Sequence, residues 1–241
     1  MNLKVKKGLS IIILLCGYLS LYAQKPTASQ TLTKIESYYK SLSEFNFEVE
    51  YKMYKGYEGN HITESYKGTM YKNGDVSQIK ILGSEIIQFS DTQLTITNDN
   101  KTLIYNKISE DVIHKSPMDV SSFLKFYKET NTEIKGNVLI HEMVIKNAQI
   151  PMPYNKIKVY VNKETSEIER QVLYLATKVP FVDENGKEAP DVGRMEISFK
   201  KNPKSVSKVP ELNDYVILDS QNNVRLAKAF TAYTIINQTN L

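Results

Sequence analysis

The residue types that most often carry out chemistry are few in this sequence and widely separated. The three histidines are His61, His114 and His141, and none of them forms the HxH or HExxH spacing of a zinc site. Asp183, Asn185 and Asp191 offer oxygens that suit calcium, but their order is not that of an EF-hand loop. No GxSxG, Walker or GxGxxG segment occurs. The sequence therefore predicts no catalytic residue, no metal site and no cofactor, and we expect a protein that is not an enzyme.

Tyrosine is the abundant residue type that could serve recognition. The chain has 16 tyrosines and no tryptophan, and Tyr38, Tyr39, Tyr51, Tyr54, Tyr57, Tyr66 and Tyr71 cluster in one stretch. An apolar ring with a polar tip suits a cavity mouth or a partner surface. Tyrosine also has a high strand propensity. Both interpretations stay open.

The residues with the clearest spacing are apolar, and they lie in the stretch 27–54. Ala28, Leu32, Ile35, Tyr39 and Leu42 recur at steps of four and three, which predicts one face of a helix with Thr27 as N-cap and Gln30 completing a capping box. From Phe45 the period becomes two: Phe45, Phe47, Val49, Tyr51 and Met53 alternate with polar residues. An amphipathic helix that leads directly into a one-sided strand is the strongest signal in the chain.

Further strands are predicted at short intervals after this stretch. Asn73-Gly74 indicates a tight hairpin turn. The predicted strands are 62–72, 75–82, 84–89, 93–97, 102–107, 138–146, 156–161, 167–178 and 193–200. Because almost no helix separates them, the pattern favours an antiparallel meander.

A second short helix interrupts the meander. Ser116-Pro117-Met118-Asp119 has the N-cap, the N1 proline and the early acid of a helix start. Val120, Phe123, Leu124 and Tyr127 then predict an apolar face, with the helix ending near Asn131. The segment 180–192 reads as a charged loop. A C-terminal hairpin, 214–219 with 224–236, is expected to turn at 221–223.

The first 23 residues read as a secretory signal peptide rather than as part of the fold. Lys4, Lys6 and Lys7 precede an apolar run, 9–15, that is too short to span a bilayer, and cleavage is expected after Ala23. Leu15 is bulky where a lipobox has a small residue, so we expect no lipid on Cys16. The mature chain, 24–241, is predicted to be a single domain with a C-terminal strand extension at about 204–241.

Removal of the signal peptide leaves 28 basic and 27 acidic residues and no cysteine. A near-neutral chain with three arginines does not favour nucleic acid. A secreted chain of this length without disulfides must depend on its hydrophobic core.

The predicted elements imply an α+β fold: an unclosed, strongly curved antiparallel half-barrel of about ten strands with two short lid helices. A curved sheet that is apolar on one face must cover that face. The helices either lid an apolar cavity that could hold a lipid chain, or they fill a solid core.

Several segments resemble the outer-membrane lipoprotein carrier (LolA-like) family. The resemblance covers about 27–200 and rests on the helix LTKIESYYKSLSEF, the strand NFEVEYKMY and the segments YKGTMYKNGD, SEIIQFSDTQLTITNDNKTLIYNK, SSFLKFYKE and NKETSEIERQVLYL. It implies a half-barrel with a helical lid that shields the acyl chains of lipoproteins in the periplasm. The family is expected to have an arginine after the second strand that holds the lid shut. Here that position falls in Lys72-Asn73-Gly74-Asp75, which has none.

We therefore expect a soluble, monomeric periplasmic carrier that binds lipoproteins or lipid acyl chains and meets envelope transport proteins and, transiently, the membrane. One lid would present Leu32, Ile35, Tyr39 and Leu42, the other Phe123, Leu124 and Tyr127, and the sheet would present Phe47, Val49, Tyr51 and Ile81. The alternative is a non-enzymatic envelope interaction or assembly protein that uses the same scaffold with a filled core.

Overall fold

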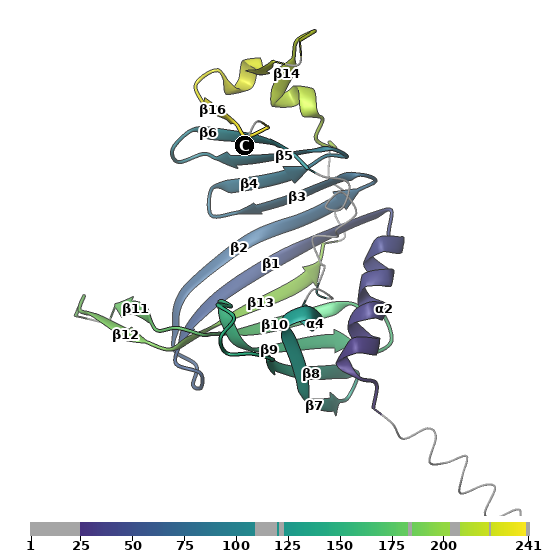
Figure 1. Cartoon of the computed structure of the whole chain (residues 1–241), viewed down its shortest axis with the longest axis vertical. Coiled ribbons are helices and arrows are strands. Elements are labelled where there is room, and N and C mark those ends of the chain that lie inside the picture. The colour runs from purple at the N-terminus through teal and green to yellow at the C-terminus, as the bar shows by residue number, and fades with distance from the viewer. Residues whose placement is uncertain are drawn as a thin grey trace, which may run out of the picture.

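The protein is built on one large curved sheet (Figure 1). The computed structural model describes residues 25–108, 120, 123–182, 185–202, 208–221 and 223–239. In this part of the chain the sheet has twelve strands in the order β16-β6-β5-β4-β3-β2-β1-β13-β10-β9-β8-β7. All neighbours are antiparallel except β16 and β6, which are parallel. The predicted open antiparallel sheet with two helices is confirmed, with more strands than the ten expected.

The strands of this sheet are β1 (Glu44–Lys55), β2 (Ile62–Asn73), β3 (Val76–Ile81), β4 (Ser84–Gln88), β5 (Thr92–Thr97), β6 (Thr102–Lys107), β7 (Tyr127–Lys135), β8 (Val138–Ile145), β9 (Tyr154–Asn162), β10 (Ile168–Leu175), β13 (Gly193–Lys201) and β16 (Thr234–Asn237).

The helix α2 (Ala28–Ser41) begins where the capping pattern predicted. The Gln30 amide donates to Thr27 Oγ1 (3.2 Å), and the Thr27 amide donates to Gln30 Oε1 (3.0 Å). These bonds satisfy two of the amides that a helix start leaves without intrahelical acceptors. Leu42 is already extended, so the chain passes from α2 into β1 within a few residues.

The alternation in β1 assigns its side chains to two faces. Phe45, Phe47 and Val49 are buried, whereas Glu44 and Glu48 are exposed. We call the face that carries Phe47 and Val49 the helix face, because α2 packs on it, and the other the reverse face. Directly paired residues on neighbouring strands share a face, so the register extends this assignment across the sheet.

Two hydrophobic cores lie on opposite faces of this one sheet. On the helix face, α2 packs against β1 and β8–β10. On the reverse face, Ile87, Leu94 and Tyr105 of β4–β6 pack with the C-terminal segment, which includes η1 (Leu212–Asp214), β14 (Val216–Leu218), β15 (Val224–Leu226) and η2 (Lys228–Phe230). Figure 1 shows α2 beside the β8 end of the sheet and the C-terminal segment at the β6 end. Each half of the sheet is therefore covered from a different side.

The predicted second helix is wrong over its C-terminal half. In the described residues it is a single turn, α4 (Phe123–Phe126), and Tyr127 begins the edge strand β7. From Thr130 to Ile134, β-branched residues alternate with Asn131 and Glu133, and pairing with β8 outweighs the helical spacing further upstream. The register between β7 and β8 shifts between Glu129 and Asn131, which marks an irregularity in this edge.

Two further predictions need correction. The segment 180–192 contains a hairpin, β11 (Val179–Val182) and β12 (Glu188–Asp191), rather than only a loop. The expected strand 224–236 is divided into β15, η2 and β16, and β16 leaves the hairpin to pair with β6. Both depend on pairings that are not visible in local sequence patterns.

Some sequence predictions lie outside the described residues: the signal peptide, the helix start at 116–119, His114 and Asp183. Within the described ranges, no helix combines the length and the apolar character that crossing a membrane requires.

A close approach of β3 to β2 requires glycine at position 68. A Cβ added to Gly68 would collide with the Lys80 carbonyl oxygen and lie 3.3 Å from Ile81 Cβ. We expect Gly68→Ala to lower the free energy of unfolding by roughly 1–3 kcal/mol, because backbone must move to admit the methyl group. Urea denaturation followed by circular dichroism measures this. Thr69→Ala, an exposed neighbour on the same strand, should change stability by less than about 0.5 kcal/mol. Equal stability of the two variants would contradict the explanation.

Candidate functional site

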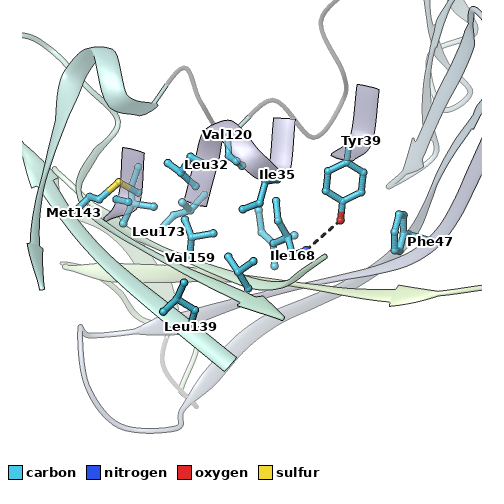
Figure 2. Close-up of a cluster of buried hydrophobic side chains, with 14 of the residues drawn as sticks. Leu32, Ile35, Tyr39, Phe47, Val120, Leu139, Met143, Val159, Ile168 and Leu173 are labelled. Carbon is cyan, nitrogen blue, oxygen red and sulfur yellow. Dashed lines mark hydrogen bonds between the residues drawn. The ribbon is translucent and has the colours of Figure 1, made fainter. Parts of the chain in front are cut away.

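The candidate site is the helix face of the sheet, where α2 lies over β8, β9 and β10. Leu32, Ile35 and Tyr39 of α2 are completely buried there. Figure 2 shows them pointing toward Leu139, Met143, Val159, Ile168 and Leu173. In this conformation the space beneath α2 is occupied by side chains of the protein itself.

The structure places ten of the eleven expected site residues in or against this core. Leu32, Ile35, Tyr39, Phe47, Val49 and Tyr127 are buried in it, and Leu42, Tyr51, Phe123 and Leu124 pack against it. Tyr127 comes from β7 and not from a helix, and its hydroxyl donates to the Tyr154 carbonyl (2.7 Å). Ile81 is directly paired with Gly68, the partner of Val49, and so lies on the same face, further from α2.

Tyr39 attaches the C-terminal half of α2 to the sheet. Its hydroxyl accepts a hydrogen bond from the Ile168 amide (3.1 Å). Its ring meets Phe45 and Phe47 edge-on, with centroid distances of 5.8 and 6.1 Å. Burial raises the pKa of Tyr39, so the hydroxyl stays neutral at physiological pH.

A buried polar network attaches the N-terminal half of α2. The imidazole of His141, on β8, contacts Thr31 Oγ1 through Nε2 (2.8 Å) and Glu129 Oε1 through Nδ1 (3.1 Å). Glu129 also accepts from the Ala28 amide (2.9 Å) and from the Thr132 hydroxyl. Each of these groups has a hydrogen-bond partner when His141 carries its proton on Nδ1, which donates to Glu129, and accepts through Nε2 from the Thr31 hydroxyl. One carboxylate thus joins the helix start to the edge of the sheet.

The two titratable groups of this network have shifted pKa values. Burial lowers the pKa of His141, against an opposing effect of Glu129. Burial alone would raise the pKa of Glu129, but hydrogen bonds from Thr132, Ala28 and His141 hold it below its usual value. The folded state therefore favours a neutral imidazole beside a charged carboxylate.

Two partly buried contacts add to the attachment of α2. The Lys72 ammonium donates to the Leu42 carbonyl at the helix end (3.1 Å). The Tyr38 hydroxyl donates to Glu167 (2.8 Å). The segment where the resemblance led us to expect an arginine therefore supplies a lysine that bonds the end of the helix.

A row that is apolar except for Thr95 continues from the core along the helix face beyond the reach of α2. Direct cross-strand pairs join Met70, Ile79, Ile86, Thr95, Ile104 and Ile236, which we call the helix-face row. Met70 is buried in the core, whereas Ile86 is 39% and Ile236 43% exposed. With strands about 4.8 Å apart, the row is about 24 Å long. The sequence did not identify the row, because its register depends on strand pairing.

The reverse face of the β1 and β8–β13 half is polar and internally paired. Lys156 lies over Tyr174 (4.1 Å to the ring centroid), and Arg194 lies over Tyr54 (4.1 Å). These four residues follow one cross-strand row. A cavity of about 700 Å³ at β1, β2 and β13 includes Glu48, Glu50, Lys67 and Lys200 among its lining residues. The lining also includes Val49 and Phe199, and its four charged side chains would lose hydration if an apolar chain filled the cavity.

The two histidines that the structure describes lie in different parts of the fold. His61 lies in an exposed loop between β1 and β2, and His141 lies in the helix-face core. Among the described residues, no three His, Cys, Asp or Glu side chains gather as a metal site requires.

No family model matches the sequence, and no curated protein does. Similar solved structures include an uncharacterized conserved protein of Thermus thermophilus (12% identity, TM-score 0.44, 88% of this chain and 99% of that chain). A LolA superfamily protein of Nitrosomonas europaea has 12% identity and a TM-score of 0.33, and the match covers 73% of this chain and 92% of that chain. A DUF1329 family protein of Desulfovibrio piger has 12% identity and a TM-score of 0.36, and the match covers 71% of this chain and 89% of that chain. The chain is thus similar in structure to a LolA superfamily protein, as the sequence resemblance suggested, at low identity and a low TM-score.

Tyr39→Phe tests how α2 is attached. The change leaves the buried Ile168 amide without its acceptor, so we expect a loss of about 1–3 kcal/mol in the free energy of unfolding. Tyr38→Phe removes the neighbouring hydroxyl at a partly exposed site and should cost less than about 1 kcal/mol. Hydrogen exchange of the α2 amides should rise more in the first variant than in the second. Equal effects would contradict the assigned role.

The His141 network predicts a pH dependence of stability. The folded chain lowers the pKa of His141, so the neutral imidazole stabilises the folded state. This contribution to the free energy of unfolding is fully present above pH 6.5, the ordinary pKa, and is lost as pH falls through the lower pKa of the folded state. Glu129 adds a second loss below its ordinary value of 4.5. In urea denaturation at a series of pH values, His141→Gln should reduce the loss of unfolding free energy that begins below pH 6.5. It should leave the loss that begins below pH 4.5. His61→Gln, in an exposed loop, is the control. An unchanged loss below pH 6.5 in His141→Gln would contradict the assignment.

Proposed function

We propose that the protein is a non-enzymatic carrier of the bacterial periplasm that binds the acyl chain of a lipid or lipoprotein on the helix face of its sheet. In this proposal residues 1–23 direct export and are removed, and 24–241 act as a single domain. The observation that carries the proposal is the helix-face row, which leads from the core beneath α2 to exposed isoleucines.

The dimensions and chemistry of the row suit an acyl chain. The hydrocarbon core of a bilayer is about 30 Å thick, so one chain reaches about 15 Å. The row of about 24 Å is long enough to hold it. Four of the six side chains are isoleucines, and Met70 and Ile79 connect with the helix-face core. A chain on this row would remove apolar surface of both molecules from water.

The helix α2 would act as the lid of this site. Leu32, Ile35, Tyr39 and Leu42 would be its inner face, and Phe47, Val49, Tyr51 and Ile81 the sheet opposite. Phe123, Leu124 and Tyr127 would form the rim. Besides its apolar packing, α2 is attached by hydrogen bonds at Ala28, Thr31, Tyr38, Tyr39 and Leu42. A bound chain that replaces the apolar contacts would displace the helix once these bonds break.

The complete burial of Leu32, Ile35 and Tyr39 favours a second candidate, an envelope interaction or assembly protein with a permanently filled core. Such a protein would keep α2 in place and would use its outer surface for a protein partner. The two candidates differ in whether the helix face binds chains at all.

Binding of a fluorescent fatty acid to the purified mature chain separates the two. We expect Ile86→Ser to weaken binding by about tenfold, because the isoleucine contributes up to about 2 kcal/mol of apolar contact. Ile62→Ser removes an isoleucine of similar exposure that lies off the row, and it should bind as the unchanged protein does. Affinity should also rise by about 0.8 kcal/mol for each added CH₂ group. Absence of binding, or no dependence on chain length, would favour the filled-core candidate.

A further inference from the structure

Two exposed apolar side chains lie on adjoining segments, α4 and the loop between β8 and β9. Phe126, at the end of α4, and Ile150, in the loop between β8 and β9, are each 37% exposed. The Lys146 amide donates to the Phe126 carbonyl (2.8 Å), which joins the two segments through their backbones. We call Phe126, Ile150 and the lysines around them the basic apolar corner.

Hydrogen bonds hold this corner in shape. The Lys146 ammonium donates to the Leu124 carbonyl (2.7 Å) and the Lys125 carbonyl (3.4 Å), which fixes the end of α4. Asn147 accepts from the Gln149 amide (2.9 Å) through its side chain and from the Ile150 amide (3.1 Å) through its carbonyl. Pro151 and Pro153 have no amide hydrogen that would need water. Ile150 is therefore presented outward by an ordered turn with few unpaired backbone donors.

Among the described residues of these two segments, the exposed charged side chains are lysines. Lys125, Lys128 and Lys146 are exposed. No aspartate or glutamate occurs in 120–128 or 143–163 of the sequence. Glu129, the next acid along β7, is turned toward His141 and the start of α2. Apolar side chains flanked by lysines, without acids between them, are the composition that binds an anionic membrane surface.

The corner is continuous with the candidate site. Phe123, Leu124 and Met152, on the same two segments, pack against the helix-face core. A chain that left a membrane at Phe126 and Ile150 would therefore have side chains of the helix-face core on the same two segments.

From the exposed pair, the ordered turn and the three exposed lysines, we propose that the basic apolar corner docks the protein on membranes rich in anionic lipids. Phe126 and Ile150 enter the interfacial layer, and Lys125, Lys128 and Lys146 lie against the headgroups. The inference goes beyond the binding of a chain, since a protein can dock here whether or not its helix face takes up lipid.

The absence of tryptophan from the chain allows a direct test. Phe126→Trp and Ile150→Trp each place one fluorophore at the corner, and Ile217→Trp places one at an exposed apolar site on the C-terminal segment. Vesicles of phosphatidylcholine, alone or mixed equally with phosphatidylglycerol, are added to each. We expect the mixed vesicles to shift the emission of the two corner probes to the blue, with quenching by brominated acyl chains, and to leave the Ile217→Trp emission unchanged.

Charge reversal and salt complete the experiment. Lys125→Glu with Lys128→Glu should weaken binding to the mixed vesicles by about tenfold or more, and added salt should weaken binding of the unchanged protein. Unshifted corner probes, equal binding to both vesicle types, or an equal shift at Ile217→Trp would each overturn the proposal. Ile86→Ser should dock normally, so failure of docking and failure of chain binding are distinguishable.

Discussion

The structure depends on one constraint: successive side chains of a strand point to opposite faces, and direct pairing carries that division across twelve strands. A single strand such as β1 therefore decides the side on which α2 must lie. The constraint also lets one sheet carry two cores, with α2 on the helix face of one half and the C-terminal segment on the reverse face of the other. Where the two coverings do not overlap, the helix face between Ile79 and Ile236 remains partly open. The candidate site follows from this offset.

Sequence patterns predicted the parts of the fold that depend on near neighbours. The capping box at Thr27, the alternation from Phe45 and the Asn73-Gly74 turn each act within a few residues, and each is present in the structure. Strand β7 and the parallel partner of β6 were missed, because both depend on pairing. The apolar face of α2 was predicted for the same local reasons. The helix-face row was not, since Ile86 stands beside Ile87 and Ile104 beside Leu103, and such runs do not reveal which side chain faces which core.

The attachment of α2 combines two kinds of interaction with different consequences. Apolar packing of Leu32 and Ile35 supplies most of the contact but does not fix the position of the helix along its axis. The bonds from Tyr39 and Thr31 have defined geometry, and a shift of the helix would leave the Ile168 amide or the His141 ring unpaired. The polar contacts therefore determine one position for α2 on the sheet. The apolar surface beneath the helix could also pack against another apolar molecule.

An open sheet ends in two edges, and such edges invite other strands to pair with them. The irregularity in β7 interrupts one edge between Glu129 and Asn131, and Lys128, Glu133 and Lys135 place charges along it. The other edge, β16, is only four residues long. The β7 edge is thus too irregular, and the β16 edge too short, for stable pairing with a strand of a second molecule. The sheet can leave its broad face accessible without joining its copies into fibrils.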